Sequence, residues 1–160
     1  MPIQKADMTA AGALAELIRA AFSDVARRFG LTPENTPRHP SNCTEEWVAD
    51  AMEKGVSYYQ MDSDGTLCGC VALERAGDDV FYLERLAVLP SFRRRGLGRA
   101  LVAHACLKAQ AAGATRLEIG IIDAQSELKS WYVRSGFEQT RTAEYAHLPF
   151  TVCFMKRELR

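Results

Sequence analysis

The chain lacks net charge, a long apolar run and a charge-free N-terminus, and each absence excludes a class of protein. Its 160 residues carry 20 Lys and Arg against 20 Asp and Glu, which argues against a general binder of nucleic acids or membrane surfaces. No stretch of 18 apolar residues occurs, so we expect no membrane span. A charge already at Lys5 predicts that no signal peptide is present. Neither nucleic acid nor a membrane is therefore an expected partner.

Paired cysteine motifs are also missing. The five cysteines are Cys43, Cys68, Cys70, Cys106 and Cys153. They form an odd set without C-x-x-C spacing, and four of the five lie in apolar segments. This pattern favours small buried side chains in a reducing cytoplasm over a disulfide framework. A covalent role for Cys106 is disfavoured because its neighbours are apolar and the sequence shows no Cys–His pairing. The three histidines (His39, His104 and His147) lack ligand spacing, which predicts no metal site.

What is present fits one globular domain over residues 1–160. Hydrophobic residues make up 48% and charged residues 25%, both ordinary values. Glycines, which adopt the left-handed conformation that ends helices, follow four helix-like segments. The helices are expected at Thr9–Phe29 with Thr9 as N-cap, from Asn42 or Thr44 to Lys54, at Leu97–Ala112 and at Ser126–Ser135.

Six strand-like runs lie between or after these helices. A further short strand is expected before the first helix. The runs are Ser57–Met61, Leu67–Arg75, Val80–Val88, Arg116–Ile122, Phe137–Tyr145 and Phe150–Arg157. Short turns predict that the first three form an antiparallel meander, and the apolar Val80–Val88 run predicts a central strand. The unit from Val80 to Ile122 is expected to be a parallel crossover. The order predicts a mixed α/β domain.

The most informative segment runs from Leu86 to Leu101. A buried strand stops at Pro90, four arginines follow within seven residues, and Gly96 and Gly98 open a helix. Glycine backbone N–H groups and a helix N-terminus favour a pyrophosphate or a similar polyanion. The segment lacks the lysine of a Walker loop and the third glycine of a dinucleotide fingerprint. The alternative interpretation is a solvated basic turn.

The spacing R-x-x-G-x-G after Leu-Ala-Val-x-Pro resembles the acyl-coenzyme A signature of the GNAT N-acetyltransferase superfamily. The resemblance covers nearly the whole chain. It implies a three-layer domain with a central, mostly antiparallel mixed sheet, helices on both faces and a V-shaped splay between the fourth and fifth strands. It also implies acetyl-coenzyme A as co-substrate, with the Val88 N–H as donor to the developing oxyanion. The residues that it assigns to the coenzyme are Leu86, Ala87, Val88, Arg93, Arg94, Arg95, Gly96, Leu97, Gly98, Arg99 and, more weakly, Gln125.

A second match lies in Trp131-Tyr132-x-x-Ser135-Gly136-Phe137, after the strand that contains Glu118. By resemblance, Tyr132 protonates the leaving thiolate, and Gln125 stands where the family often has a coenzyme-binding asparagine. Glutamine has the same hydrogen-bonding groups with a longer reach. The alternative is that Trp131 and Tyr132 only pack as aromatic side chains in the core.

Two glutamates interrupt apolar strands. Glu84 and Glu118 either face a wet cleft, where one of them takes the proton of the amine, or form ion pairs with Arg85 or Arg116. Strand alternation predicts that Glu84 shares a face with Leu86 and Val88, with Arg85 on the other face.

The leading hypothesis is therefore direct acetyl transfer from acetyl-coenzyme A to a primary amine of a small molecule or peptide. A non-catalytic acyl-coenzyme A sensor is the alternative, and a nucleotide- or RNA-binding domain fits the zero net charge poorly. The acceptor side is expected in residues 31–43 and 138–148, with Arg38, His39, Arg141, Glu144, Tyr145 and His147. A homodimer through the apolar run Phe150–Met155 is a further possibility, since many members of the family are dimers.

Overall fold

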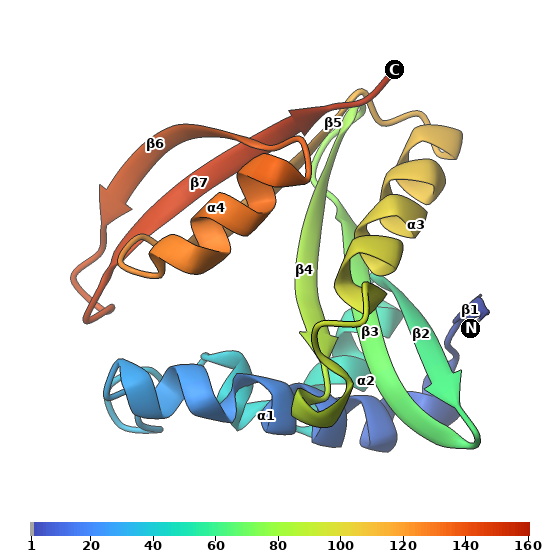
Figure 1. Ribbon diagram of the computed structural model, residues 1–160, viewed down its shortest axis with the longest axis horizontal. Helices are drawn as coiled ribbons and strands as arrows, with labels where there is room; N and C mark the ends of the chain where they lie inside the picture. Colours follow the sequence, from blue (N-terminus) through green and yellow to red (C-terminus); the bar gives the residue numbers. More distant parts are fainter. Residues whose placement is uncertain (1) are drawn as a thin grey trace.

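The computed structural model describes residues 2–160. Four α-helices and seven strands make up the framework (Figure 1). The helices are α1 (Ala11–Arg28), α2 (Glu45–Glu53), α3 (Leu97–Ala111) and α4 (Ser126–Arg134). The strands are β1 (Ile3–Lys5), β2 (Ser57–Ser63), β3 (Thr66–Arg75), β4 (Val80–Val88), β5 (Arg116–Ile122), β6 (Glu138–Glu144) and β7 (Thr151–Glu158). The expected elements are thus confirmed, with boundaries that differ by a few residues.

One mixed sheet carries all seven strands in the order β1-β2-β3-β4-β5-β7-β6. Every neighbouring pair is antiparallel except β4 and β5, which are parallel and joined through α3. This confirms the antiparallel meander, the parallel crossover and the central place of β4.

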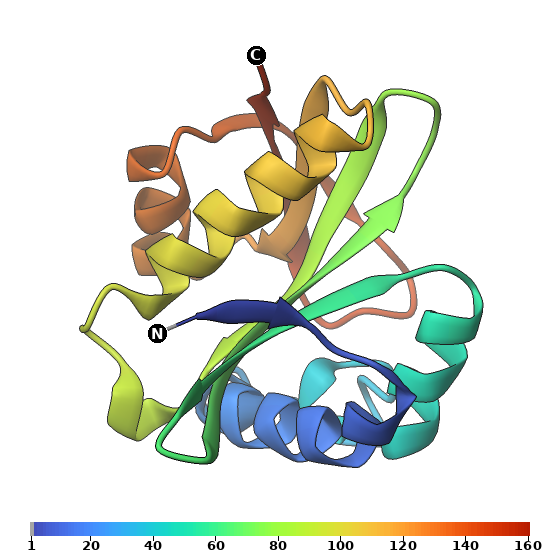
Figure 2. The same cartoon turned by 90° about the vertical axis from the view of Figure 1, so that its right-hand side faces the viewer.

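Helices cover both faces of the sheet, so the domain has three layers (Figures 1 and 2). On one face α1 and α2 pack on β2, β3 and β4 around Leu14, Ile18 and Val48. On the other face α3 and α4 pack on the sheet around Leu101 and Leu117. Burial of these apolar faces is what holds the layers together.

Helix ends follow the local signals with one exception. The Thr44 side chain accepts a hydrogen bond from the Trp47 N–H, so Thr44 is the N-cap of α2. The expectation that Thr9 caps the first helix is wrong. A 3-10 turn (Met8–Ala10) precedes α1, and the Asp7 side chain caps that turn by accepting from the Thr9 N–H. A carboxylate in this position satisfies an N–H group that the turn leaves unpaired.

A β-bulge in β4 opens the sheet. Ala72 of β3 pairs with Glu84 and Cys70 pairs with Ala87, so Val71 alone faces two residues of β4. One of these, Arg85, has a φ of 51° in the left-handed region. Bulges bend and twist a strand. The pairing of β4 with β5 ends at Tyr82 and Glu118, although both strands continue, and this is the V-shaped splay.

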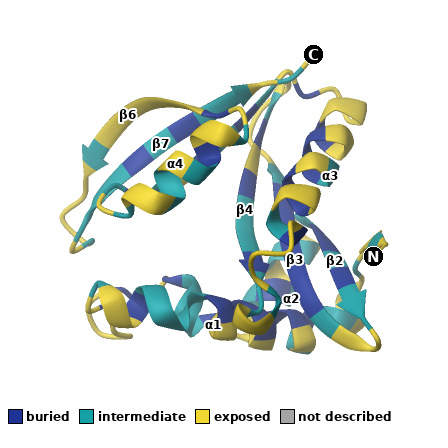
Figure 3. Ribbon diagram, viewed as in Figure 1, coloured by how far each residue is buried: buried dark blue, intermediate teal, exposed yellow. Residues whose placement is uncertain are grey.

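The C-terminal run Phe150–Met155 lies mostly within β7, which pairs with β5 on one side and β6 on the other. Its backbone is therefore occupied within the sheet, and the edge strand is the largely exposed β6 (Figure 3). Among residues 2–160 no helix has both the length and the apolar character that a membrane crossing needs.

Candidate active site

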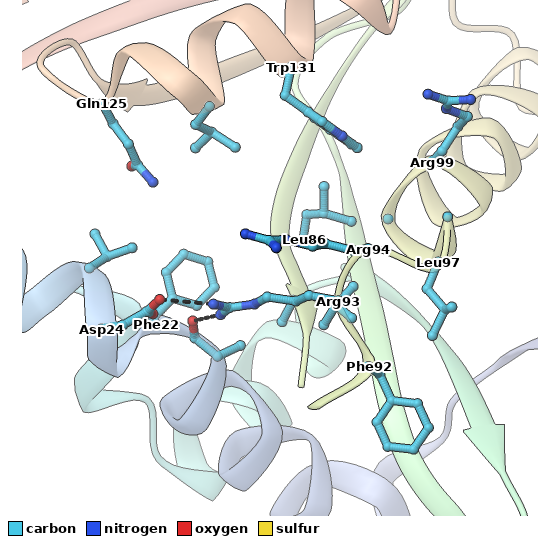
Figure 4. Close-up of a pocket in the computed structure, with 17 residues that line it drawn as sticks. Phe22, Asp24, Leu86, Phe92, Arg93, Arg94, Leu97, Arg99, Gln125 and Trp131 are labelled. Carbon is cyan, nitrogen blue, oxygen red and sulfur yellow. Dashed lines mark hydrogen bonds and ion pairs between the residues drawn. The ribbon is translucent and has the colours of Figure 1, made fainter. Parts of the chain in front are cut away.

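A cavity of about 690 Å³ opens beside the strand edge that the bulge frees. We call it the first cavity. It lies between α1, the C-terminal half of β4, the N-terminus of α3 and α4 (Figure 4). All but one of the residues assigned by resemblance to the coenzyme line it: Leu86, Ala87, Val88, Arg93, Arg94, Gly96, Leu97, Gly98, Arg99 and Gln125. The exception is Arg95, whose guanidinium lies over the Phe92 ring, 5.1 Å from its centroid.

The turn before α3 has a backbone suited to an anion. Arg94 has a φ of 65° and Gly96 a φ of 79°, so left-handed residues alternate in the turn and Gly96 is the N-cap of α3. No side chain caps this helix end, which leaves its first N–H groups for a ligand. A Cβ built on Gly98 would lie 3.4 Å from the Trp131 ring, so glycine also lets α3 and α4 approach closely. This geometry fits a pyrophosphate group.

The arginines of the turn have different surroundings. Arg93 bonds to α1, with Nη1 2.8 Å from Asp24 Oδ2 and Nη2 donating to the Ala21 carbonyl at 2.7 Å. The same bond to Arg93 lowers the pKa of Asp24. In residues 2–160, the Arg94 and Arg99 guanidinium groups have no hydrogen-bond or ion-pair partner. Arg94 extends into the cavity, whereas Arg93 turns to α1 (Figure 4). The Arg93 side chain thus fixes the turn to α1, and Arg94 and Arg99 are the ones available to an anion.

The backbone of β4 offers hydrogen-bonding groups to the same cavity. The Leu89 N–H donates to the Cys68 carbonyl at 2.9 Å. Since N–H groups alternate in direction along an antiparallel strand, the Val88 N–H is directed away from β3, toward the gap between β4 and β5. This direction fits both pairing with an extended ligand and the predicted contact with an oxyanion.

A second cavity of about 900 Å³ continues from the first. Both are lined by a common set of residues, namely Phe22, Val25, Leu86, Gln125 and Leu128. All three predicted catalytic residues (Glu84, Glu118 and Tyr132) line the second cavity. A molecule in the first cavity and a molecule in the second can therefore meet beside Leu86.

Glu84 is half-buried and its carboxyl group is paired with another carboxyl group. Burial is the largest cause that raises the pKa of Glu84 to about 8, and the second is a hydrogen bond with Glu74 of β3. The nearby Arg85 lowers the pKa of Glu84 but is outweighed. Two carboxyl groups in contact retain a proton between them because both cannot easily be charged. A carboxyl group with this pKa is suited to accept a proton near neutral pH.

The prediction of which β4 side chains lie on the same face of the sheet is wrong beyond Leu83. Glu84 and Ala87 pair with Ala72 and Cys70, which lie in the core under α1 and α2, whereas Val88 packs in the core under α3. Glu84 therefore lies on the face opposite to Val88. The extra residue of the bulge shifts the two-residue alternation by one.

Glu118 accepts a hydrogen bond from Arg116 Nε at 2.8 Å. The ion pair that the sequence left open as an alternative is therefore present, and it lies on the wall of the second cavity. Because the Glu118 carboxylate already binds Arg116, this side chain is the weaker candidate for a base.

Tyr132 is buried on the inner face of α4. Its ring packs edge-on against Trp131 and Phe137, with centroids 5.0 and 5.3 Å away. Burial raises the pKa of Tyr132, so its hydroxyl keeps its proton at neutral pH. The packing expected under the alternative is present, and the hydroxyl-bearing side chain also lines the second cavity. The two roles are compatible.

The acceptor side is only partly as expected. Arg38, His39 and Arg141 line the second cavity, whereas Glu144, Tyr145 and His147 do not. Burial is the larger cause that lowers the pKa of His39 to about 4. His39 is therefore neutral, with Nδ1 accepting from the Ser41 N–H.

Sequence reasoning missed the contributions of α1 and β3. Phe22, Asp24 and Val25 line the first cavity, and Glu74 contacts Glu84. No local signal in the sequence distinguishes Phe22 from the other apolar residues of α1. Glu74 lies two residues from Ala72, which pairs with Glu84, so only the pairing register brings the two glutamates together. Among residues 2–160 no group of three or more His, Cys, Asp or Glu side chains could hold a metal ion.

Comparisons with known proteins agree with this geometry. The model of the acetyltransferase (GNAT) family matches residues 13–137. A search of curated proteins gives no match. The fold is similar to that of the ribosomal-protein-S18-alanine N-acetyltransferase from Escherichia coli, with a TM-score of 0.78 at 17% identity over 99% of this chain and 93% of that one.

Two structures with a bound coenzyme are also similar. The putative acetyltransferase yncA from Salmonella typhimurium, solved with acetyl-CoA, gives a TM-score of 0.73 at 19% identity and covers 100% of this chain and 94% of that one. The paia N-acetyltransferase from Thermoplasma acidophilum, solved with coenzyme A, gives 0.76 at 16% identity and covers 98% of both chains. With the family model spanning most of its length, this chain belongs to the GNAT acetyltransferase family.

Proposed function

We propose that this acetyltransferase moves an acetyl group from acetyl-coenzyme A directly to a primary amine of a small molecule or peptide. The observation that carries the proposal is the junction of the two cavities beside Leu86. One cavity begins at an anion-binding turn, and the other is lined by a proton acceptor and a proton donor, Glu84 and Tyr132.

In this proposal the first cavity holds the coenzyme. The N–H groups around Gly96, with Arg94 and Arg99, bind the pyrophosphate, because backbone donors and guanidinium groups complement its charge. The free edge of β4 and the apolar side chains of Phe22 and Leu128 hold the pantetheine arm. Bound acetyl-coenzyme A supplies the acetyl group as a thioester.

Three groups of the chain then act in the transfer. Glu84 accepts a proton from the amine, directly or through water, which frees the nitrogen lone pair for attack. The Val88 N–H donates to the carbonyl oxygen as its negative charge grows. The Tyr132 hydroxyl donates its proton to the sulfur as the carbon–sulfur bond breaks, and the proton that the nitrogen loses as the amide forms returns to the tyrosine through water. No covalent enzyme intermediate is needed, since the amine attacks the carbonyl carbon itself.

The test is a calorimetric titration with acetyl-coenzyme A, followed by a thiol-release assay with a panel of primary amines. We expect binding and amine-dependent thiol release. Arg94→Gln and Arg99→Gln should weaken binding and reduce its salt dependence, while Arg27→Gln, an exposed change outside both cavities, should do neither. Absence of binding would overturn the proposal.

Binding without thiol release for any amine would favour the alternative, a non-catalytic acyl-coenzyme A sensor. In this proposal residues 1–160 form one catalytic domain that acts in the cytoplasm. All five cysteines are buried, and the free thiols of Cys43, Cys70, Cys106 and Cys153 support the reducing compartment.

A further inference from the structure

The second cavity carries more positive than negative side chains. Its charged lining comprises five cations (Arg38, Arg85, Arg116, Arg141 and Lys156) and two carboxyl groups (Glu84 and Glu118). Burial raises the pKa of Glu84 to about 8, so this carboxyl group is mostly neutral at pH 7, which reduces the negative charge further. A cavity with this balance attracts anions and repels polycations.

Four of the five cations have a local partner. Arg116 binds Glu118, and Lys156 lies 3.1 Å from Glu158. The remaining two stack on aromatic rings, Arg38 over Trp47 and Arg141 over Phe154. In the part of the chain that the structure describes, the Arg85 guanidinium has no hydrogen-bond, ion-pair or ring partner. Its donors are thus the ones available to a ligand.

The surroundings of Arg85 suit a bound anion. Arg85 is half-buried and close enough to His39 and Tyr58 to affect the pKa of both. His39 is neutral, so it does not compete as a cation. A guanidinium fork pairs with a carboxylate through two parallel hydrogen bonds, and partial burial strengthens them. Arg85 also has the left-handed backbone of the bulge, which is costly for a residue with a side chain.

Arg85 and Glu84 are consecutive in the bulged part of β4, and both line the second cavity beside Leu86, where the two cavities meet. Both are also close enough to the buried Tyr58 to affect its pKa. Because the two residues are consecutive, a group on Arg85 and an amine on Glu84 are separated by a short distance. This spacing fits a molecule in which few bonds separate a carboxylate from the amino group.

We propose that the acceptor is an amino acid, whose amino group approaches Glu84 while its carboxylate binds Arg85. The inference rests on the proposed function and adds the substrate class. A diamine or polyamine has no group for Arg85 and meets the excess of positive charge.

The experiment compares the standard amino acids with their carboxamides, which keep the side chain and amine but lack the negative charge. The rate constant kcat/KM is measured at saturating acetyl-coenzyme A and expressed per deprotonated amine. We expect wild-type protein to prefer at least one amino acid over its amide. Arg85→Gln should lower kcat/KM for that amino acid about 10- to 100-fold, the range for a lost charge-assisted pair, with the amide rate almost unchanged.

Three further variants make the result specific. Arg85→Lys keeps the charge and loses the fork, so an intermediate loss is expected. Arg134→Gln, an exposed change on α4 outside both cavities, should leave the preference intact. If Arg85→Gln does not fold, Arg85→Gly removes the guanidinium from a backbone position that glycine accepts.

Outcomes for the two proposals are distinguishable. The Arg85 assignment would be overturned if amines are acetylated without preference for a carboxylate, or if the preference survives in Arg85→Gln. Either result would leave the proposed function intact. If no amine is acetylated, the proposed function fails. Calorimetric titration of amino acids into the coenzyme A complex then tests the Arg85 assignment by itself. Binding that is lost in Arg85→Gln would support the assignment, and no binding to the wild type would overturn it.

Discussion

Glu84 is the residue in the second cavity whose protonation changes near neutral pH. Since burial and Glu74 raise its pKa to about 8, the free base is the minor form at pH 7 and becomes the major form above pH 8. We expect kcat/KM to rise with pH and to level off above this value. Glu84→Gln should lower kcat/KM and remove the rise, as measured by pH–rate profiles with an amine of low pKa.

Two neighbouring variants separate this role from other origins of the profile. Glu74→Gln removes the second carboxyl group of the pair, so the rise should move to lower pH. Glu118→Gln changes a carboxylate that already pairs with Arg116, and the rise should stay in place. An unchanged rise in Glu84→Gln would mean that the proton goes to solvent.

Tyr132 packs in the core and also lines the second cavity. Removing its hydroxyl oxygen separates a packing role from an acid role. Tyr132→Phe keeps the ring contacts with Trp131 and Phe137. If the hydroxyl is the general acid, kcat should fall about 10²-fold or more while the Kd for coenzyme A is unchanged. Tyr59→Phe is the matched control, because Tyr59 is buried yet lines neither cavity. Full activity of Tyr132→Phe would leave the tyrosine with packing alone.

At the scale of elements, the turn between β4 and α3 can be tested against another glycine turn. Gly96 and Gly55 both have positive φ, 79° and 97°, and a Cβ on either meets no atom within 4 Å. Alanine at either position should lower the free energy of unfolding by roughly 1–2 kcal/mol, the cost of a left-handed residue.

Only Gly96→Ala should also weaken acetyl-coenzyme A binding, because its Cβ and altered backbone lie at the N–H groups that we propose bind the pyrophosphate. Urea unfolding and calorimetry on the two variants give the comparison. Equal coenzyme affinity in both would place the pyrophosphate elsewhere.

At the scale of the whole molecule, two cavity residues give stability opposite dependences on pH. Folding raises the pKa of Glu84 from 4.5 to about 8. Between these values the folded state holds more protons, so the free energy of unfolding falls as pH rises. Folding lowers the pKa of His39 from 6.5 to about 4, so its contribution is lost as pH falls through this window.

Urea unfolding from pH 4 to pH 8.5 measures both effects. Glu84→Gln should reduce the fall in the free energy of unfolding as pH rises. His39→Gln should reduce the fall in the free energy of unfolding as pH drops. Parallel curves for wild type and both variants would contradict these pKa shifts.

Local sequence determined the features that depend on a few consecutive residues. Glycines after α1, α2, α3 and α4 end the helices because an L residue is strained at positive φ. The arginine–glycine turn predicts an anion site for the same kind of reason, since its N–H groups come from one short segment. Most of the residues that line the first cavity on β4 and α3 could accordingly be predicted.

Only the tertiary structure decided which side chains share a face and a partner. The bulge at Arg85 depends on the pairing of β4 with β3, and a shift of one residue moved Glu84 to the face opposite to Val88. The contact of Glu84 with Glu74 and the bond of Arg93 to Asp24 join residues distant in sequence. Such contacts follow from strand register and layer packing, which no local window of sequence contains.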